Sequence, residues 1–336
     1  MFKQSVKKVL TPFKSWLTAE TRTALNVSLL LQGTMASWNV RSRAVISSLQ
    51  DVEFKVSSQW GEDGIIDWLV ERANIPPNSR TFIEFGVEDY REANTRFILQ
   101  NRNWRGLIMD GDSAMVKTIT TEPLALANYL SLALAHHLTA RQAFITRENI
   151  NELISSSGFS GDVGLLSIDI DGNDYWVWEA IEIVRPIICI CEYNAAFGDL
   201  HPVSIPYDPT FSRTKAQDSN LYYGASIKAL CSLGARKGYR FVGTTSAGND
   251  AFFVREDFAK QFVDNSLQHI RALPSLFREG MQESGQRNYI GGLDRLKYIS
   301  ALPLVNTETG KTVKLSDLGP LYSPEWLALM TGTTTG

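Results

Sequence analysis

The chain has 336 residues, of which 44% are hydrophobic and 21% are charged, and its formal net charge is -3. This balance is that of an ordinary globular protein, and it excludes a chain-wide nucleic-acid surface, because binding the phosphate backbone needs a large positive area. The three cysteines form no Cys-x-x-Cys pair, which favours buried thiols over a disulfide framework or a structural zinc site.

Residues 1–45 are expected to form a separate arm. Apolar side chains recur there at spacings of three and four, with lysines between them, which predicts a basic amphipathic helix. They are Phe2, Val6, Leu10, Phe13 and Leu17. Such a helix packs on its own domain, contacts a sister subunit in a homo-oligomer, or lies on an anionic membrane. We expect packing on the domain or on a sister subunit to be commoner than membrane contact. Residues 1–20 would make the contact to a subunit or to the inner membrane.

From about residue 56 the pattern alternates between helices and short apolar strands. We expect helices at 62–73, 94–100, 123–137, 148–155, 175–184 and 226–237. We expect strands at 80–86, 106–110, 140–145, 163–170 and 187–192, followed by a hairpin of 239–243 and 250–254. This alternation predicts an α/β fold of the Rossmann-like class, a mainly parallel doubly wound sheet with a terminal antiparallel hairpin.

The rest of the chain divides into shorter pieces. A helix over 258–276 and a hairpin over 302–315 are expected to form a C-terminal extension at 256–330, with a disordered tail at 331–336. The main domain then covers 46–255.

The uncharged stretches at 23–40 and 123–140 are short and polar for a membrane span, and the N-terminus lacks the features of a secretion signal. The sequence therefore predicts a cytoplasmic protein.

Parallel sheets bind ligands at the carboxyl ends of their strands, and acidic residues gather at those positions here. The first strand ends in Glu84 and Gly86, and a glycine there lets backbone amides approach a ligand closely. No Gly-x-Gly-x-x-Gly sequence follows, which argues against a dehydrogenase. Acids suit a cationic donor such as S-adenosylmethionine better than a pyrophosphate. Asp110 ends the second strand, where an acid can accept ribose hydroxyls; the alternative is a solvated turn.

The fourth and fifth strands end in further polar residues. Asp169, Asp171 and Asp174 could bind the donor's amine, act as a base, or hold Mg²⁺ or Mn²⁺. Capping of the next helix by Asn173 or Asp174 explains one of these acids.

The segment after the fifth strand supplies candidate acceptor contacts. Glu192 and Asn194 are expected to face one cleft, and together with Tyr193 they are candidates for contact with the acceptor. The segment 194–220 is long for a compact domain, and loops of that length are usually functional. His201 in this segment is either a third candidate base or a surface histidine.

The order of these motifs, over about 56–255, resembles the FkbM-like branch of the S-adenosylmethionine-dependent methyltransferases. The matching motifs are Ser58-Gln59-x-x-Glu62-Asp63, Glu84-x-Gly86, Asn94-Thr95, Trp104-Arg105-Gly106-Leu107 before Asp110, and Ser167-Ile168-Asp169-Ile170-Asp171-Gly172. One departure is Tyr90, which stands where the family has a second glycine after the first strand.

The resemblance implies a class I methyltransferase fold and O-methylation of a hydroxyl on a saccharide, a glycan or a related natural product. The implied donor site consists of Gln59, Glu84, Gly86, Asn94, Thr95, Asp110 and Asp169. A sugar hydroxyl is a weak acid, so a base or metal beside it should help. Asp171 is the first candidate base, and Asp169 and Asp171 are the candidate metal pair.

Two other functions remain open from the sequence. A metal-dependent glycosyltransferase could use Asp169-x-Asp171 to hold a nucleotide sugar. A non-catalytic assembly protein could retain the methyltransferase fold and use the basic arm as its contact.

Overall fold

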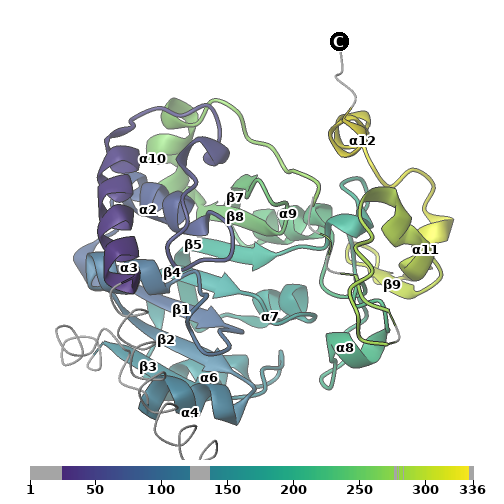
Figure 1. The fold of residues 1–336 in the computed structure, drawn as a ribbon, viewed down its shortest axis with the longest axis horizontal. Helices are drawn as coiled ribbons and strands as arrows, with labels where there is room; N and C mark the ends of the chain where they lie inside the picture. The colour runs from purple at the N-terminus through teal and green to yellow at the C-terminus, as the bar shows by residue number, and fades with distance from the viewer. Residues whose placement is uncertain (1–24, 122–136, 276–277, 279, 283, 333–336) are drawn as a thin grey trace, which may run out of the picture.

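The computed structural model describes residues 25–121, 137–275, 278, 280–282 and 284–332. A seven-stranded sheet with the order β3-β2-β1-β4-β5-β8-β7 lies at its centre (Figure 1). Its strands are β1 (Thr81–Phe85), β2 (Arg105–Asp110), β3 (Leu138–Gln142), β4 (Gly161–Ile168), β5 (Val184–Glu192), β7 (Tyr239–Thr244) and β8 (Asp250–Arg255). The first five are parallel, while β8 runs antiparallel to both β5 and β7. The predicted doubly wound sheet with a terminal hairpin is confirmed.

Helices cover both faces of this sheet. The α-helices of the sheet region are residues 25–42, α2 (Glu62–Ala73), α3 (Arg96–Arg102), α4 (Ser113–Thr121), α6 (Ile150–Ser156), α7 (Asp174–Ala180), α9 (Ile227–Arg236) and α10 (Glu256–Ser266). Phe82 packs with α2, α3 and α10 on one face, whereas Ile83 and Phe85 pack with α6, α7 and α9 on the other. Alternate residues of a strand point to opposite faces, and both faces are apolar here because both are covered.

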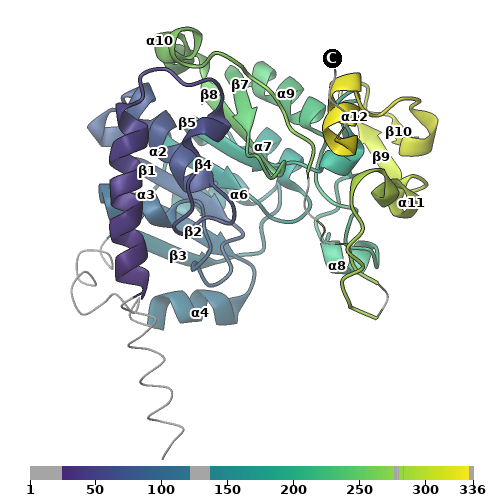
Figure 2. The same ribbon diagram turned by 45° about the horizontal axis from the view of Figure 1, so that its top comes forward.

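The later part of the C-terminal extension, from residue 292 onward, lies beyond the carboxyl ends of the parallel strands (Figures 1 and 2), whereas α10 packs on the face of the sheet with α2. Its strands β9 (Pro303–Asn306) and β10 (Thr312–Lys314) form the predicted hairpin, and β6 (Val203–Ser204) joins them in a small antiparallel sheet. The helices of this region are α8 (Arg213–Ala216), α11 (Leu296–Ile299) and α12 (Pro324–Thr331). Segments from the long loop and the extension thus lie together above the sheet edge.

One predicted helix is shorter in the structure, and another lies largely outside the described residues. The helix predicted at 258–276 ends at Ser266, because Leu267 pairs with Ile46 and the next two backbone N–H groups bond to the carbonyls of 46 and 47. The helix predicted at 123–137 lies almost entirely outside the described residues, as does the amphipathic arm up to residue 24. Within the described ranges, no helix is long and apolar enough to cross a bilayer.

Candidate functional site

A cavity of about 430 Å³ opens at the carboxyl ends of the parallel strands, a volume typical of small-molecule sites. It lies where β1 and β4 are neighbours and the strand order reverses, the position at which open α/β sheets bind ligands. Its lining comes from the ends of β1 to β5, from the β7–β8 turn, from the loop holding α8, and from the extension through Ser275 and Arg295.

Gly86 joins the ends of three strands in this cavity. Its backbone has φ of +72°, and a Cβ added there would lie 1.7 Å from the carbonyl oxygen of Asp169. Its N–H donates to the carbonyl of Met109. Both the positive φ and the close approach require glycine, so this residue keeps β1, β2 and β4 together at the cavity floor.

The Glu84 carboxylate is occupied by the chain itself. It accepts hydrogen bonds from the backbone N–H groups of Asn94 (2.7 Å) and Thr95 (3.1 Å) and from the Thr95 hydroxyl (2.5 Å). Burial raises the pKa of Glu84 to about 7, against the lowering effect of these donors. Glu84 therefore fixes the 94–95 turn. Asn94 lines the cavity, whereas the buried Thr95 lies outside its lining, which corrects the expectation that Thr95 contacts a ligand.

Asp110 presents a partly exposed carboxylate at the end of β2. One oxygen accepts the backbone N–H of Glu88 and the other that of Asp112, both at 2.8 Å. Each carboxylate oxygen can accept more than one hydrogen bond, so room remains for ligand hydroxyls. On the same wall stands Phe144, whose side chain is 58% exposed. Sequence reasoning missed Phe144, although an aromatic residue just after a strand is a usable signal.

The Ser58–Asp63 motif is mainly a structural device. One Asp63 oxygen accepts the backbone N–H groups of residues 56–58 and the Ser58 hydroxyl. These bonds fold the loop over the start of α2, and the loop brings Gln59 and Trp60 into the cavity lining. Gln59, the residue of this motif that is predicted to contact the donor, thus lies at the cavity.

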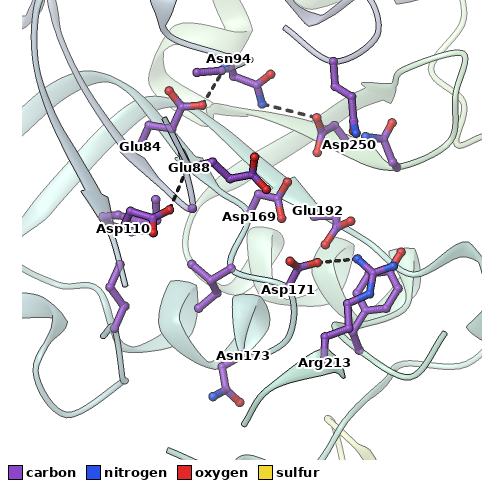
Figure 3. Close-up of a pocket in the computed structure, with 18 of the residues that line it drawn as sticks. Glu84, Glu88, Asn94, Asp110, Asp169, Asp171, Asn173, Glu192, Arg213 and Asp250 are labelled. Carbon is purple, nitrogen blue, oxygen red and sulfur yellow. Dashed lines mark hydrogen bonds and ion pairs between the residues drawn. The ribbon is translucent and has the colours of Figure 1, made fainter. Parts of the chain in front are cut away.

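Three carboxylates meet at the ends of β4 and β5. One oxygen from each of Asp169, Asp171 and Glu192 lies within 4.8 Å of the others (Figure 3). The parallel register pairs Ile168 with Cys191, so the next residues along, Asp169 and Glu192, emerge side by side. Burial, followed by the charge of Asp171, raises the pKa of Asp169, and burial followed by the charge of Asp169 raises that of Glu192. The two groups oppose each other's ionisation.

Asp174 shapes the turn that presents Asp171. Its two oxygens accept the backbone N–H groups of Ile170 and Gly172 at 2.8 and 2.9 Å, and Asp171 between them adopts a left-handed φ of +55°. Burial raises the pKa of Asp174 to about 6. The prediction that Asn173 or Asp174 caps the next helix is wrong: Asn173 occupies the N-cap position without a side-chain capping bond, and Asp174, the first residue of α7, bonds to the turn before the helix.

Two further residues complete this side of the cavity and were not predicted. Arg213, on α8, bonds to Asp171 at 2.5 Å, and its guanidinium lies 3.6 Å from the centre of the Tyr223 ring. Asp250, which opens β8, is buried and lies 3.5 Å from the amide of Asn94. The length of the 194–220 loop was the only signal for Arg213, and nothing in the sequence marked Asp250.

Besides Thr95, three more predicted residues lie outside the cavity lining. The Tyr193 hydroxyl donates to the carbonyl of Leu273. The Asn194 amide donates to two backbone carbonyls and accepts one N–H. A ring nitrogen of His201 lies 2.8 Å from the carbonyl of Pro320. The expectation of a shared cleft failed because β5 ends at Glu192, and alternation does not continue past a strand end. His201 is therefore withdrawn as a candidate base.

No family model matches this chain. The search of curated proteins also returned no match. Among solved structures, the chain is similar to an O-methyltransferase from Bacillus cereus in complex with SAH, at 13% identity and a TM-score of 0.36, covering 67% of this chain and 89% of that one. It is also similar to the glycopeptide N-methyltransferase MtfA complexed with sinefungin, at 11% identity and a TM-score of 0.35, covering 65% and 94%. Likenesses this distant carry no conclusion about the ligand or the reaction.

Proposed function

We propose that this chain is an S-adenosylmethionine-dependent O-methyltransferase that acts on a hydroxyl of a saccharide, a glycan or a related natural product. The observation that carries the proposal is the wall formed by Asp110 and Phe144 beside the Gly86 turn. A carboxylate that accepts ribose hydroxyls, next to an exposed aromatic ring and Met109, fits a nucleoside. Gln59 and Asn94 line the same space and would contact the rest of the donor.

The charge of the cavity supports a cationic donor. Its lining contains eight acidic side chains and two arginines: Glu84, Glu88, Glu92, Asp110, Asp169, Asp171, Glu192 and Asp250 against Arg213 and Arg295. Such a lining disfavours a pyrophosphate, which argues against a dinucleotide. It favours a ligand that carries an ammonium and a sulfonium, and among known donors S-adenosylmethionine carries both.

The acceptor class rests on the composition of the other half of the cavity. Carboxylates accept hydrogen bonds from hydroxyls, and Trp60, Phe211 and Tyr223 supply aromatic faces in the same lining. Carboxylates and aromatic side chains in one lining suit a saccharide. The ordered motifs are also similar to those of the FkbM-like family, whose members commonly methylate hydroxyls of sugars, polyketides and surface glycans.

The chain's part in the reaction is alignment and proton removal. When bound, the donor would supply a methyl group attached to a sulfonium. Transfer of that methyl to the acceptor oxygen converts the sulfonium into a neutral thioether, which is the leaving group. Asp171 would receive the hydroxyl proton and return it to water, because its side chain is 60% exposed. Gly86 and the 94–95 turn hold the wall on which the donor would lie.

The test is a calorimetric titration of the purified protein with S-adenosylmethionine and with its demethylated product. We expect micromolar binding that Asp110→Ala weakens at least a hundredfold. Asp112→Ala is the matched control, since Asp112 lies next to the same strand end but only caps the start of α4 and does not line the cavity. Equal donor affinity in both variants would contradict the assignment of Asp110.

A panel of nucleotide sugars distinguishes the alternatives. Binding of a nucleotide sugar in the presence of metal, with no response to the methyl donor, would move the assignment to glycosyl transfer. Binding of neither class would favour the non-catalytic assembly role. A donor response opens a screen of glycan acceptors for methyl transfer.

A further inference from the structure

The two carboxylates that the sequence marks after β4 are joined by a third from another strand. Glu192 ends β5, and its carboxylate lies within 4.8 Å of those of Asp169 and Asp171. In Figure 3 the three carboxyl groups turn toward one another inside the cavity. Asp169 and Asp171 follow β4 and Glu192 ends β5, so the pairing of these two strands holds the three acids close together.

A second observation concerns the Glu192 carboxylate, which has one oxygen without a hydrogen-bond partner in the part of the chain that the structure describes. Glu192 is only 8% exposed, and its Oε2 has no hydrogen-bond partner among the described residues. Native proteins pair nearly all buried polar atoms. Glu192 lines the cavity, so a group bound in the cavity can reach its carboxylate and supply the missing partner.

The chemistry of the three side chains selects the ligand. Carboxylate oxygens are the preferred ligands of hard divalent cations, with bonds of about 2.0–2.2 Å for Mg²⁺. Two ligands of one such ion lie about 3–4.4 Å apart by that geometry, so oxygens within 4.8 Å of one another need only small movements to share it. Because Arg213 already pairs with Asp171, a divalent cation would balance the charge of three ionised carboxylates, whereas a single ammonium would leave one negative charge.

We propose that Asp169, Asp171 and Glu192 bind one divalent cation of the Mg²⁺ or Mn²⁺ class in the acceptor half of the cavity. Arg213 contacts Asp171 from the protein side, at 2.5 Å, and places a positive charge beside the ion. Asp171 therefore lies between the guanidinium and the cation. Three protein ligands leave coordination positions for water or for oxygens of the acceptor.

The role of this ion rests on the proposed function. A cation that binds the acceptor hydroxyl lowers its pKa and orients its oxygen, which suits a sugar hydroxyl and an acceptor with two neighbouring oxygens. Binding of the ion does not rest on that function, so the two can be tested separately.

The experiment is a titration of the full-length protein with Mn²⁺, in which electron paramagnetic resonance follows the free ion. We expect one site per chain, weakened at least tenfold by Glu192→Gln and by Asp169→Asn. Glu92→Gln is the matched control, because it removes the same charge from an exposed part of the same cavity lining; its Mn²⁺ affinity should stay within threefold of the wild type. Arg213→Gln should tighten binding at least threefold, an effect that partial unfolding cannot produce.

Each outcome bears on one proposal alone. Absence of Mn²⁺ binding at millimolar concentration, or equal affinity in wild type and Glu192→Gln, would overturn the cation site. Glu192→Gln should keep the circular dichroism spectrum and the cooperative thermal melting of the wild type, which shows that the variant is folded. Donor binding without Mn²⁺ binding leaves the methyltransferase proposal standing, and Mn²⁺ binding without donor binding leaves only the cation site.

Discussion

The cavity has two halves, and their carboxylates differ in what they bond to. At the ends of β1 and β2, Glu84 and Asp110 accept backbone N–H groups of their own chain. At the ends of β4 and β5, Glu192 keeps a buried oxygen without a partner among the described residues, and Asp171 bonds to an arginine from a distant loop. The carboxylates of the first half are thus bonded by the chain itself, while the second half keeps a carboxylate oxygen that the described residues do not bond.

This difference separates two uses of the same residue type at the same edge of a sheet. A carboxylate that receives several backbone donors holds a turn in place, and the turn then forms a wall. A carboxylate without such donors costs free energy in the apo protein, which binding of a cation or of a polar ligand can recover. Strand ends alone do not reveal which use applies.

The largest expected effect comes from the residue that joins the two halves. Gly86→Ala places a methyl group against the Asp169 carbonyl in a backbone with positive φ. We expect the free energy of unfolding to fall by about 4 kcal/mol, from strain and overpacking together. Urea denaturation measures it. Gly111→Ala is the control, because its added carbon meets the Phe144 ring at an ordinary 3.7 Å. Equal stability of the two variants would show that Gly86 does not join the halves.

A smaller effect follows from the Glu84 carboxyl. Its folded pKa of about 7 lies above the ordinary value of 4.5, so the folded state holds the proton more tightly than the unfolded state. The resulting stability is present below pH 4.5 and is lost as the pH rises to about 7, with a total of about 3 kcal/mol. Glu84→Gln removes this part of the pH dependence.

The measurement for Glu84 is a series of urea denaturation curves between pH 4.5 and pH 8 for wild type and Glu84→Gln. Asp174 has a pKa of about 6 and adds a slope of the same sign to both proteins, so the difference between the two curves isolates Glu84. A constant difference across this range would mean that the Glu84 carboxyl is not held as the structure has it.

The smallest effect sharpens the division between the halves. Phe144→Ala should weaken S-adenosylmethionine about tenfold, since stacking of an aromatic ring contributes about 1 kcal/mol beyond its buried area. Phe211→Ala makes the same change on the other half, where Phe211 packs against Gly172, and should leave donor affinity unchanged. Calorimetry on both variants measures this, and a reversed order would exchange the donor and acceptor halves.

The sequence by itself determined the sheet and much of its edge. Apolar runs that alternate with helical periodicity define β1, β2, β4 and β5, because a strand covered on both faces is apolar throughout. Residues directly at strand ends, such as Gly86, Asp110 and Asp169, were placed correctly in the cavity, since parallel strands bring their carboxyl ends to one edge.

The tertiary structure decided which of these side chains remain available to a ligand. Tyr193 and Asn194 follow β5 more closely in sequence than Asp171 follows β4, yet their polar groups donate to backbone carbonyls. Arg213 and Asp250 reach the cavity from a long loop and from an antiparallel strand. Those pairings depend on contacts between residues far apart in the chain, so periodicity and local motifs carry no information about them.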